Sequence, residues 1–135
     1  MPYEIVDHKA DVGLHVSGGD LARLFADAAR GMFGIISAEP PEGWPESHRV
    51  ELEADDTEQL IVDWLSELIY LFEVKKFFLL DAEVAEIGPK KIVADVSGLR
   101  TRGAFAGTEI KAVTHHLLSI DKTLKGFETT IYFDL

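Results

Sequence analysis

The chain has 135 residues, is 47% hydrophobic, contains no cysteine and carries a formal net charge of −11. This length predicts one compact core, and therefore a single domain over residues 1–135. The absence of cysteine excludes disulfides, thiol catalysis and thiolate zinc sites, which leaves oxygen or imidazole ligands for any metal. The acidic charge opposes direct contact with nucleic acid and suits a cation, a basic protein partner or plain solubility.

Neither a membrane span nor a secretory signal is evident in the sequence. The apolar runs at residues 60–72 and 76–80 fall short of the roughly 20 apolar residues that a span requires. The N-terminus has no basic region followed by an apolar stretch. We therefore expect a cytoplasmic protein that makes no use of a membrane.

Two strands and a helix are predicted first. Residues 3–7 and 11–17 read as strands, and apolar and polar residues alternate along the second of them. This alternation places Asp11 on a polar face. A helix over about residues 20–34 follows, because Asp20 is a favourable N-cap and apolar residues then recur at helical spacing.

A loop, a strand and the central helix are predicted next. Three prolines and a glycine within residues 38–47 favour a loop. Residues 48–54 alternate as in a half-buried strand. The second helix, over about residues 57–74, starts with Asp56 and Gln59 in capping-box spacing and carries a broad apolar stripe.

The remaining sequence is predicted to be mostly strand. The expected strands cover residues 77–87, 91–96, 115–121 and 127–135, with an irregular segment at residues 97–108. Most strands follow one another directly and do not alternate with helices. We therefore predict an α+β fold with largely antiparallel sheets and two main helices.

The last predicted strand places Asp134 on its polar face, next to Leu135, the last residue of the sequence. The side chain of Asp134 and the α-carboxylate of Leu135, joined by Asp11, would suit a hard cation such as calcium, which takes about six to eight oxygen ligands. The sequence does not establish that the two strands meet. On these residues alone, an ordinary frayed acidic terminus is the simpler interpretation.

The histidines offer further candidates. His8 is close enough in sequence to Asp11 to share a site as a base, a ligand or a hydrogen-bond partner. His115 and His116 are adjacent in a predicted strand and would point to opposite faces, so they are poor joint ligands of one ion. For His8 and His116 we favour structural hydrogen bonding over catalysis.

Five segments, taken together and in order, resemble the archease family. They are residues 7–13 (DHKADVG), 30–33 (RGMF), 60–68 (LIVDWLSEL), 107–116 (GTEIKAVTHH) and 132–135 (YFDL). The resemblance spans nearly the whole chain and implies an archease-like fold. It also implies a calcium-type site, for calcium or another divalent hard cation, at Asp11, Asp134 and Leu135. Lys111 looks like a further functional position that touches a partner or its nucleotide.

The same resemblance implies a protein that is not an enzyme and acts in tRNA splicing. It would promote the guanylylation and multiple turnover of an RtcB-type RNA ligase, which uses GTP and a metal to join tRNA halves. Nucleic acid would be reached only through the ligase.

Two alternatives stay open. One is a small metal-dependent phosphoesterase or nucleotide hydrolase that uses Asp11, His8 and Asp134, which would require a deep pocket with a positioned nucleophile. The other is a structural or chaperone protein that binds calcium for stability.

Overall fold

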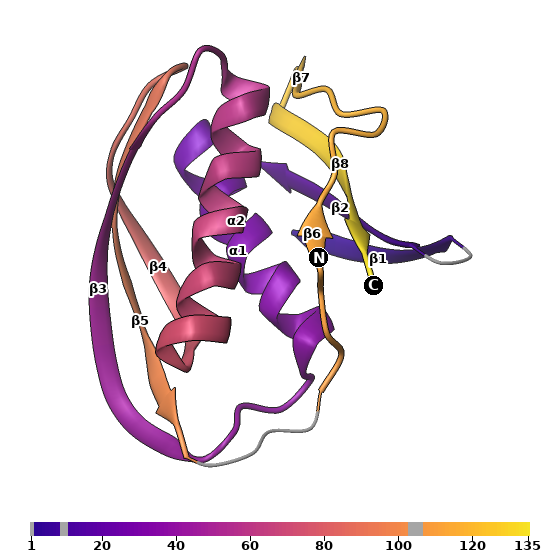
Figure 1. Cartoon of the computed structure of the whole chain (residues 1–135). Coiled ribbons are helices and arrows are strands. Elements are labelled where there is room, and N and C mark those ends of the chain that lie inside the picture. Colours follow the sequence, from indigo (N-terminus) through magenta and orange to yellow (C-terminus); the bar gives the residue numbers. More distant parts are fainter. Residues whose placement is uncertain (1, 9–10, 103–106) are drawn as a thin grey trace.

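The computed structural model describes residues 2–8, 11–102 and 107–135. Within these ranges, two helices lie between two antiparallel sheets (Figure 1). The elements in chain order are β1 (Tyr3–His8), β2 (Asp11–Gly18), α1 (Leu21–Ile36), β3 (Gly43–Glu53), α2 (Thr57–Lys75), β4 (Phe77–Ile87), β5 (Lys91–Thr101), β6 (Ala112–Val113), β7 (Asp121–Thr123) and β8 (Gly126–Asp134).

All the strand pairs that the structure describes are antiparallel. One sheet has the order β1-β2-β8-β6, with β7 also paired to β8, and the other has the order β3-β5-β4. The predicted α+β class with antiparallel sheets and two main helices is confirmed. Neither α1 nor α2 is long and apolar enough to cross a membrane.

The hydrophobic core fills the space between the layers. Helix α1 contacts β2 on one side and β4 on the other, and α2 contacts β4 and β6. The largest fully buried side chains include Trp64, Phe25 and Phe133, one from each helix and one from β8. Trp64 donates its indole N–H to the carbonyl of Phe25 at 3.0 Å, so the largest core residue brings no unsatisfied polar group with it.

Both predicted helices are confirmed within two residues, and so are their N-caps. The carboxylate of Asp20 accepts a hydrogen bond from the Arg23 amide at 2.9 Å, and that of Asp56 accepts from the Gln59 amide at 2.7 Å. The side chain of Gln59 does not act as in a capping box, because its amide donates to Asp63 at 2.8 Å. Only the first half of the predicted capping box is therefore formed.

Two strands are longer than the sequence predicted. β3 begins at Gly43 inside the predicted loop, and β5 continues to Thr101 inside the predicted irregular segment. Pro45 belongs to β3, which is an edge strand of its sheet. An edge strand tolerates proline because a missing N–H need not cost a ladder hydrogen bond. The predicted loop therefore extends too far, because the prolines were taken to exclude a strand before residue 48.

The predicted strand over residues 115–121 is wrong. The structure instead has the short strands β6 and β7, with a turn between them in which the Leu118 amide donates to the His115 carbonyl at 3.1 Å. Leu117 in this turn has φ 52°. That left-handed conformation cannot continue an extended ladder, and alternation of side chains does not reveal it.

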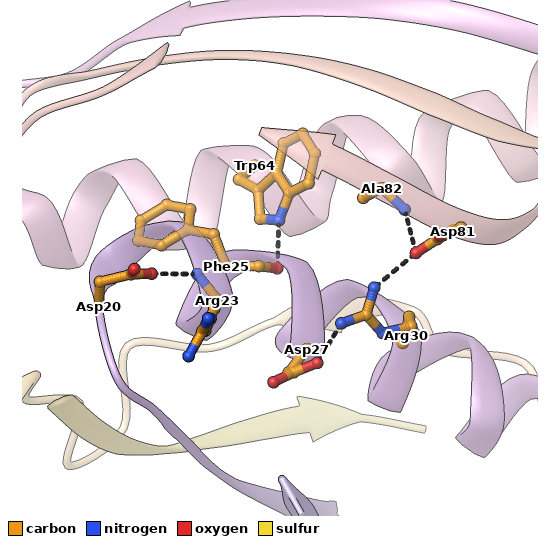
Figure 2. A network of polar contacts seen from close by, with 8 residues as sticks. All are labelled: Asp20, Arg23, Phe25, Asp27, Arg30, Trp64, Asp81 and Ala82. Carbon is orange, nitrogen blue, oxygen red and sulfur yellow. Dashed lines mark hydrogen bonds and ion pairs between the residues drawn. The ribbon is translucent and has the colours of Figure 1, made fainter. Parts of the chain in front are cut away.

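A polar network fixes α1 to β4 (Figure 2). The guanidinium of Arg30 donates to Asp81 at 2.5 Å and to Asp27 one turn earlier in the helix. Burial lowers the pKa of Arg30, but the hydrogen bonds and charges of Asp27 and Asp81 outweigh burial and hold that pKa above its usual value. The side chain of Asp27 is largely buried, and its carboxylate is paired with Arg30.

Candidate metal site

Asp11 and Asp134 lie directly opposite each other on neighbouring strands. β2 pairs with β8 in a register that joins Asp11 to Asp134, Val12 to Phe133 and so on along the ladder. Directly paired residues project from the same face of a sheet, with Cβ atoms about 4.5–5.5 Å apart. Asp11 is half-buried and Asp134 is exposed, so the pair lies on the solvent side of this sheet.

The register follows from the hydrophobic core. Val12 and Phe133 form the next pair, and both are buried on the opposite face. A slip by one residue would turn these side chains outward and bring both aspartates inward, which would cost the burial of two charges. The two carboxylates therefore meet because the apolar face requires this pairing.

The backbone of Lys111 lies beside Asp134. Its amide donates to the carbonyl of Asp134 at 2.8 Å, and the next residue, Ala112, pairs with Asp134 across β6 and β8. The Lys111 side chain is exposed. Segments that are more than 90 residues apart in the sequence thus meet at the end of β8 (Figure 1).

The histidine candidates separate in the structure. The backbone of His8 pairs with that of Asp11. The side chain of His8 and residues 9–10 are outside the part of the chain that the structure describes. His116 makes an edge-to-face ring contact with Tyr132, at 5.5 Å between centroids, whereas His115 hydrogen-bonds to Gln59 at 3.0 Å. The two rings therefore have different partners, although both residues lie outside regular strand.

The sequence did not single out Tyr132 as a residue near the candidate site. It pairs with Gly13 and lies two residues before Asp134 on the same face of β8. That two-residue spacing is the sequence signal that would have indicated it. Its contact with His116 places an aromatic pair beside the aspartates.

The donor chemistry of the aspartate pair suits a hard cation. Like charges directly opposite each other on neighbouring strands repel. Among the residues described, neither Asp11 nor Asp134 makes a side-chain ion pair or hydrogen bond that would relieve this repulsion. Carboxylate oxygens are the ligands that calcium prefers.

The site is nevertheless partial. Within the described ranges, no three or more His, Asp or Glu side chains are grouped so that they could hold a metal. Two side-chain carboxylates leave most positions of a calcium shell for water, backbone oxygens or a partner. The arrangement suits an ion held at an interface better than a closed structural site.

A pocket of about 440 Å³ lies elsewhere, at the ends of α1, α2 and β5. Its lining includes Phe72, Glu73, Lys76 and Ile110 and neither of the two aspartates. This pocket therefore does not supply the deep, aspartate-lined cavity that the hydrolase alternative requires.

The fold and the paired aspartates define a small α+β protein with an open carboxylate pair where β2 begins and β8 ends. Comparison with known sequences identifies its relatives. The model of the Archease protein family matches residues 3–135. Protein archease of Methanosarcina barkeri is 35% identical, with 98% of this chain and 95% of the relative covered. The Archaeoglobus fulgidus protein archease is 32% identical with both chains fully covered. This chain belongs to the archease family.

Solved structures agree on the fold. The solution structure of Methanobacterium thermoautotrophicum protein 1598 has a TM-score of 0.73 and 24% identity, covering 99% of both chains. A Thermotoga maritima crystal structure, described as that of "an archease, possible chaperone", has a TM-score of 0.69 and 23% identity over 96% of this chain and 94% of the other. The shared fold includes the two helices and antiparallel sheets described above.

Proposed function

We propose that this protein is a metal-dependent activator of an RtcB-type tRNA-splicing RNA ligase, promoting its guanylylation and multiple turnover. The observation that carries the proposal is the direct pairing of Asp11 with Asp134 across β2 and β8, together with the hydrogen bond from the Lys111 amide to the Asp134 carbonyl. Each comes from a different one of the segments that resemble the archease family. Three segments that are distant in the sequence are thereby brought together at the end of β8.

In this proposal, Asp11, Asp134 and Leu135 hold calcium or another divalent hard cation. The ion would neutralise the facing carboxylates and offer its free coordination positions to an oxygen ligand of the ligase. Lys111, whose amide is bonded to Asp134, carries an exposed positive charge that would suit an acidic group of the ligase or a phosphate of its nucleotide. The activator therefore needs no nucleophile of its own.

A helper role, not catalysis, agrees with the Thermotoga maritima relative, which is described as a possible chaperone. Under this proposal the protein acts in the cytoplasm, where the ligase meets tRNA halves, and reaches tRNA through the ligase. The net charge of −11 supports this arrangement, because a strongly acidic surface is repelled by a phosphate backbone.

The test is multiple-turnover RNA ligation by the matching ligase, with and without this protein, in calcium and after chelation. We expect wild-type protein to increase the number of turnovers, and Asp11→Ala or Asp134→Ala to lose most of that increase, by about tenfold or more, because each removes a ligand. Glu128→Ala removes an equal charge from the same face of β8 and should retain activation.

Unchanged activation by the Asp134→Ala protein would refute the role given to the paired aspartates. Substrate turnover by the isolated protein, in the absence of ligase, would instead support the hydrolase alternative.

A further inference from the structure

A cationic and aromatic patch lies at the end of the three-stranded sheet, on a chain that is otherwise strongly acidic. Trp44 of β3 pairs directly with Arg100 of β5. Directly paired residues project from the same face, so the indole and the guanidinium share one surface. Trp44 is 57% exposed, and Arg100 is exposed as well.

A second arginine lies over the same indole. The guanidinium carbon of Arg102 is 5.6 Å from the centre of the Trp44 ring, which is the geometry of a cation–π contact. The Arg102 amide donates to the carbonyl of Glu42 at 3.2 Å, so the backbone pairing continues past the ends of both strands. Arg102 is thus held near the ring by its backbone.

The C-terminal end of α2 adds positive charge beside these residues. The Lys76 carbonyl accepts a hydrogen bond from the Thr101 amide at 2.7 Å, next to Arg100. Lys75 and Lys76 are both exposed. Lysines at a helix C-terminus are explained by the helix dipole, but that explanation does not extend to the two arginines on a strand.

The two arginines also differ from others in the chain. Arg30 is paired with Asp81, and Arg49 is paired with Asp95. Among residues 2–8, 11–102 and 107–135, no carboxylate forms an ion pair with Arg100 or Arg102. Glu46, on the same face two residues after Trp44, is hydrogen-bonded to His48 at 2.8 Å. The arginines are therefore available to an anion from outside.

We propose that Trp44, Arg100 and Arg102 bind one nucleotide unit. Its base stacks on the exposed part of the indole and its phosphate binds the guanidinium of Arg100, with Arg102 closing the other side of the ring. Aromatic stacking accepts any base, and arginine binds phosphate through two parallel hydrogen bonds.

The net charge of the chain favours a site for one nucleotide unit over a site for a longer nucleic acid. One indole and two arginines match a single unit, whereas a longer polyanion would meet the repulsion of a chain with net charge −11. The site lies on the three-stranded sheet, and the helices separate it from Asp11 and Asp134 on the other sheet (Figure 1). It does not rest on the proposed function.

The experiment is calorimetric titration of the full chain with adenosine 5′-monophosphate at low salt. Adenosine and inorganic phosphate are the two half-ligands, and we expect each to bind about tenfold more weakly, because each lacks one of the two contacts. Tryptophan fluorescence gives a second readout. Trp64 is fully buried, so contact quenching reports on Trp44.

Trp44→Ala and Arg100→Ala should each weaken binding of the nucleotide about fivefold or more, the lower end of what one stacked base contributes. Arg49→Ala changes the charge equally on the same sheet and should leave binding within about twofold, since Arg49 is already paired with Asp95. Melting curves establish that each variant is folded. The same titration is repeated with a single-stranded RNA decamer. If the decamer binds about tenfold more tightly than the mononucleotide, the bound nucleotide unit belongs to a nucleic-acid strand. If the two bind equally, the ligand is a free nucleotide.

Three results would overturn the proposal. The first is the absence of nucleotide binding at millimolar concentration. The second is an equal loss in the Arg49→Ala variant, which would indicate unspecific attraction. The third is tighter binding of a decaglutamate peptide than of the nucleotide, which would make the patch a contact for an acidic protein.

Discussion

Single residues in this protein show how charge is either compensated or left open. Arg30 is bound between two aspartates, and Arg49 is paired with Asp95 on the sheet surface. The hydrogen bonds and charge of Asp95 hold the pKa of Arg49 above its usual value. Asp11 and Asp134, by contrast, face each other with the same sign. Because of that contrast, we propose their position as a place for a ligand.

At Gly126, the backbone conformation and the close neighbours accept only glycine. Its φ is +139°, and a Cβ placed there would lie 2.2 Å from the Gly18 carbonyl oxygen. We expect Gly126→Ala to lower the free energy of unfolding by about 2 kcal/mol or more, from backbone strain and this clash. Urea denaturation measures the change.

Gly88→Ala is the matched control, because a Cβ at Gly88 would meet no atom within 4 Å. It should change stability by no more than about 0.5 kcal/mol. Equal effects of the two substitutions would mean that the positive φ and the clash at Gly126 do not account for the loss.

The ends of the helices and strands are determined partly by local sequence and partly by tertiary contacts. The start of α2 is determined by local sequence, since Asp56 caps the helix and Glu58 lies in its first turn. The end of α2 is a left-handed residue, Lys76, whose φ of 60° reverses the chain into β4. A helix start needs one side chain, whereas its end here depends on the strand that follows.

Asp56→Ala tests the cap. It should destabilise the protein by about 1 kcal/mol, because the Gln59 amide loses its acceptor, and Asp56→Asn should restore most of this. Thermal unfolding followed by circular dichroism gives the measurement. Asp55→Ala removes the same charge one residue earlier and should have little effect, so comparable losses would assign the change to charge and not to capping.

For the whole molecule, the two helices separate the two sheets, and the two surfaces proposed for binding lie on different sheets (Figure 1). Asp11 and Asp134 belong to the five-stranded sheet, whereas Trp44 and Arg100 belong to the three-stranded sheet. A single core joins both layers. A ligand at either surface therefore stabilises the same folded state.

Calcium binding should accordingly appear in global stability. At a concentration about one hundred times its dissociation constant, calcium should raise the free energy of unfolding by about 2.7 kcal/mol. The shift in melting temperature should vanish in Asp134→Asn and persist in Glu128→Gln, which lies on the same face of β8. A shift of equal size in Asp134→Asn would place the ion elsewhere.

The sequence by itself determined the elements whose signals are local. The two helices with their caps, the alternation in β2 and β8, and the polar faces of Asp11 and Asp134 follow from side-chain periodicity and hydrogen-bonding chemistry. The family resemblance supplied the rest of the functional expectation. No pattern within one strand states which strand it will pair with.

Only the tertiary structure decided the features that depend on distant partners. The pairing of Asp11 with Asp134, the extension of β3 through Pro45 and the turn at Leu117 each arise from contacts that local sequence does not contain. The physical reason is that strand register and edge position are set by the burial of the whole apolar face. The same reason brings Trp44 and Arg100 together, although 55 residues of chain lie between them.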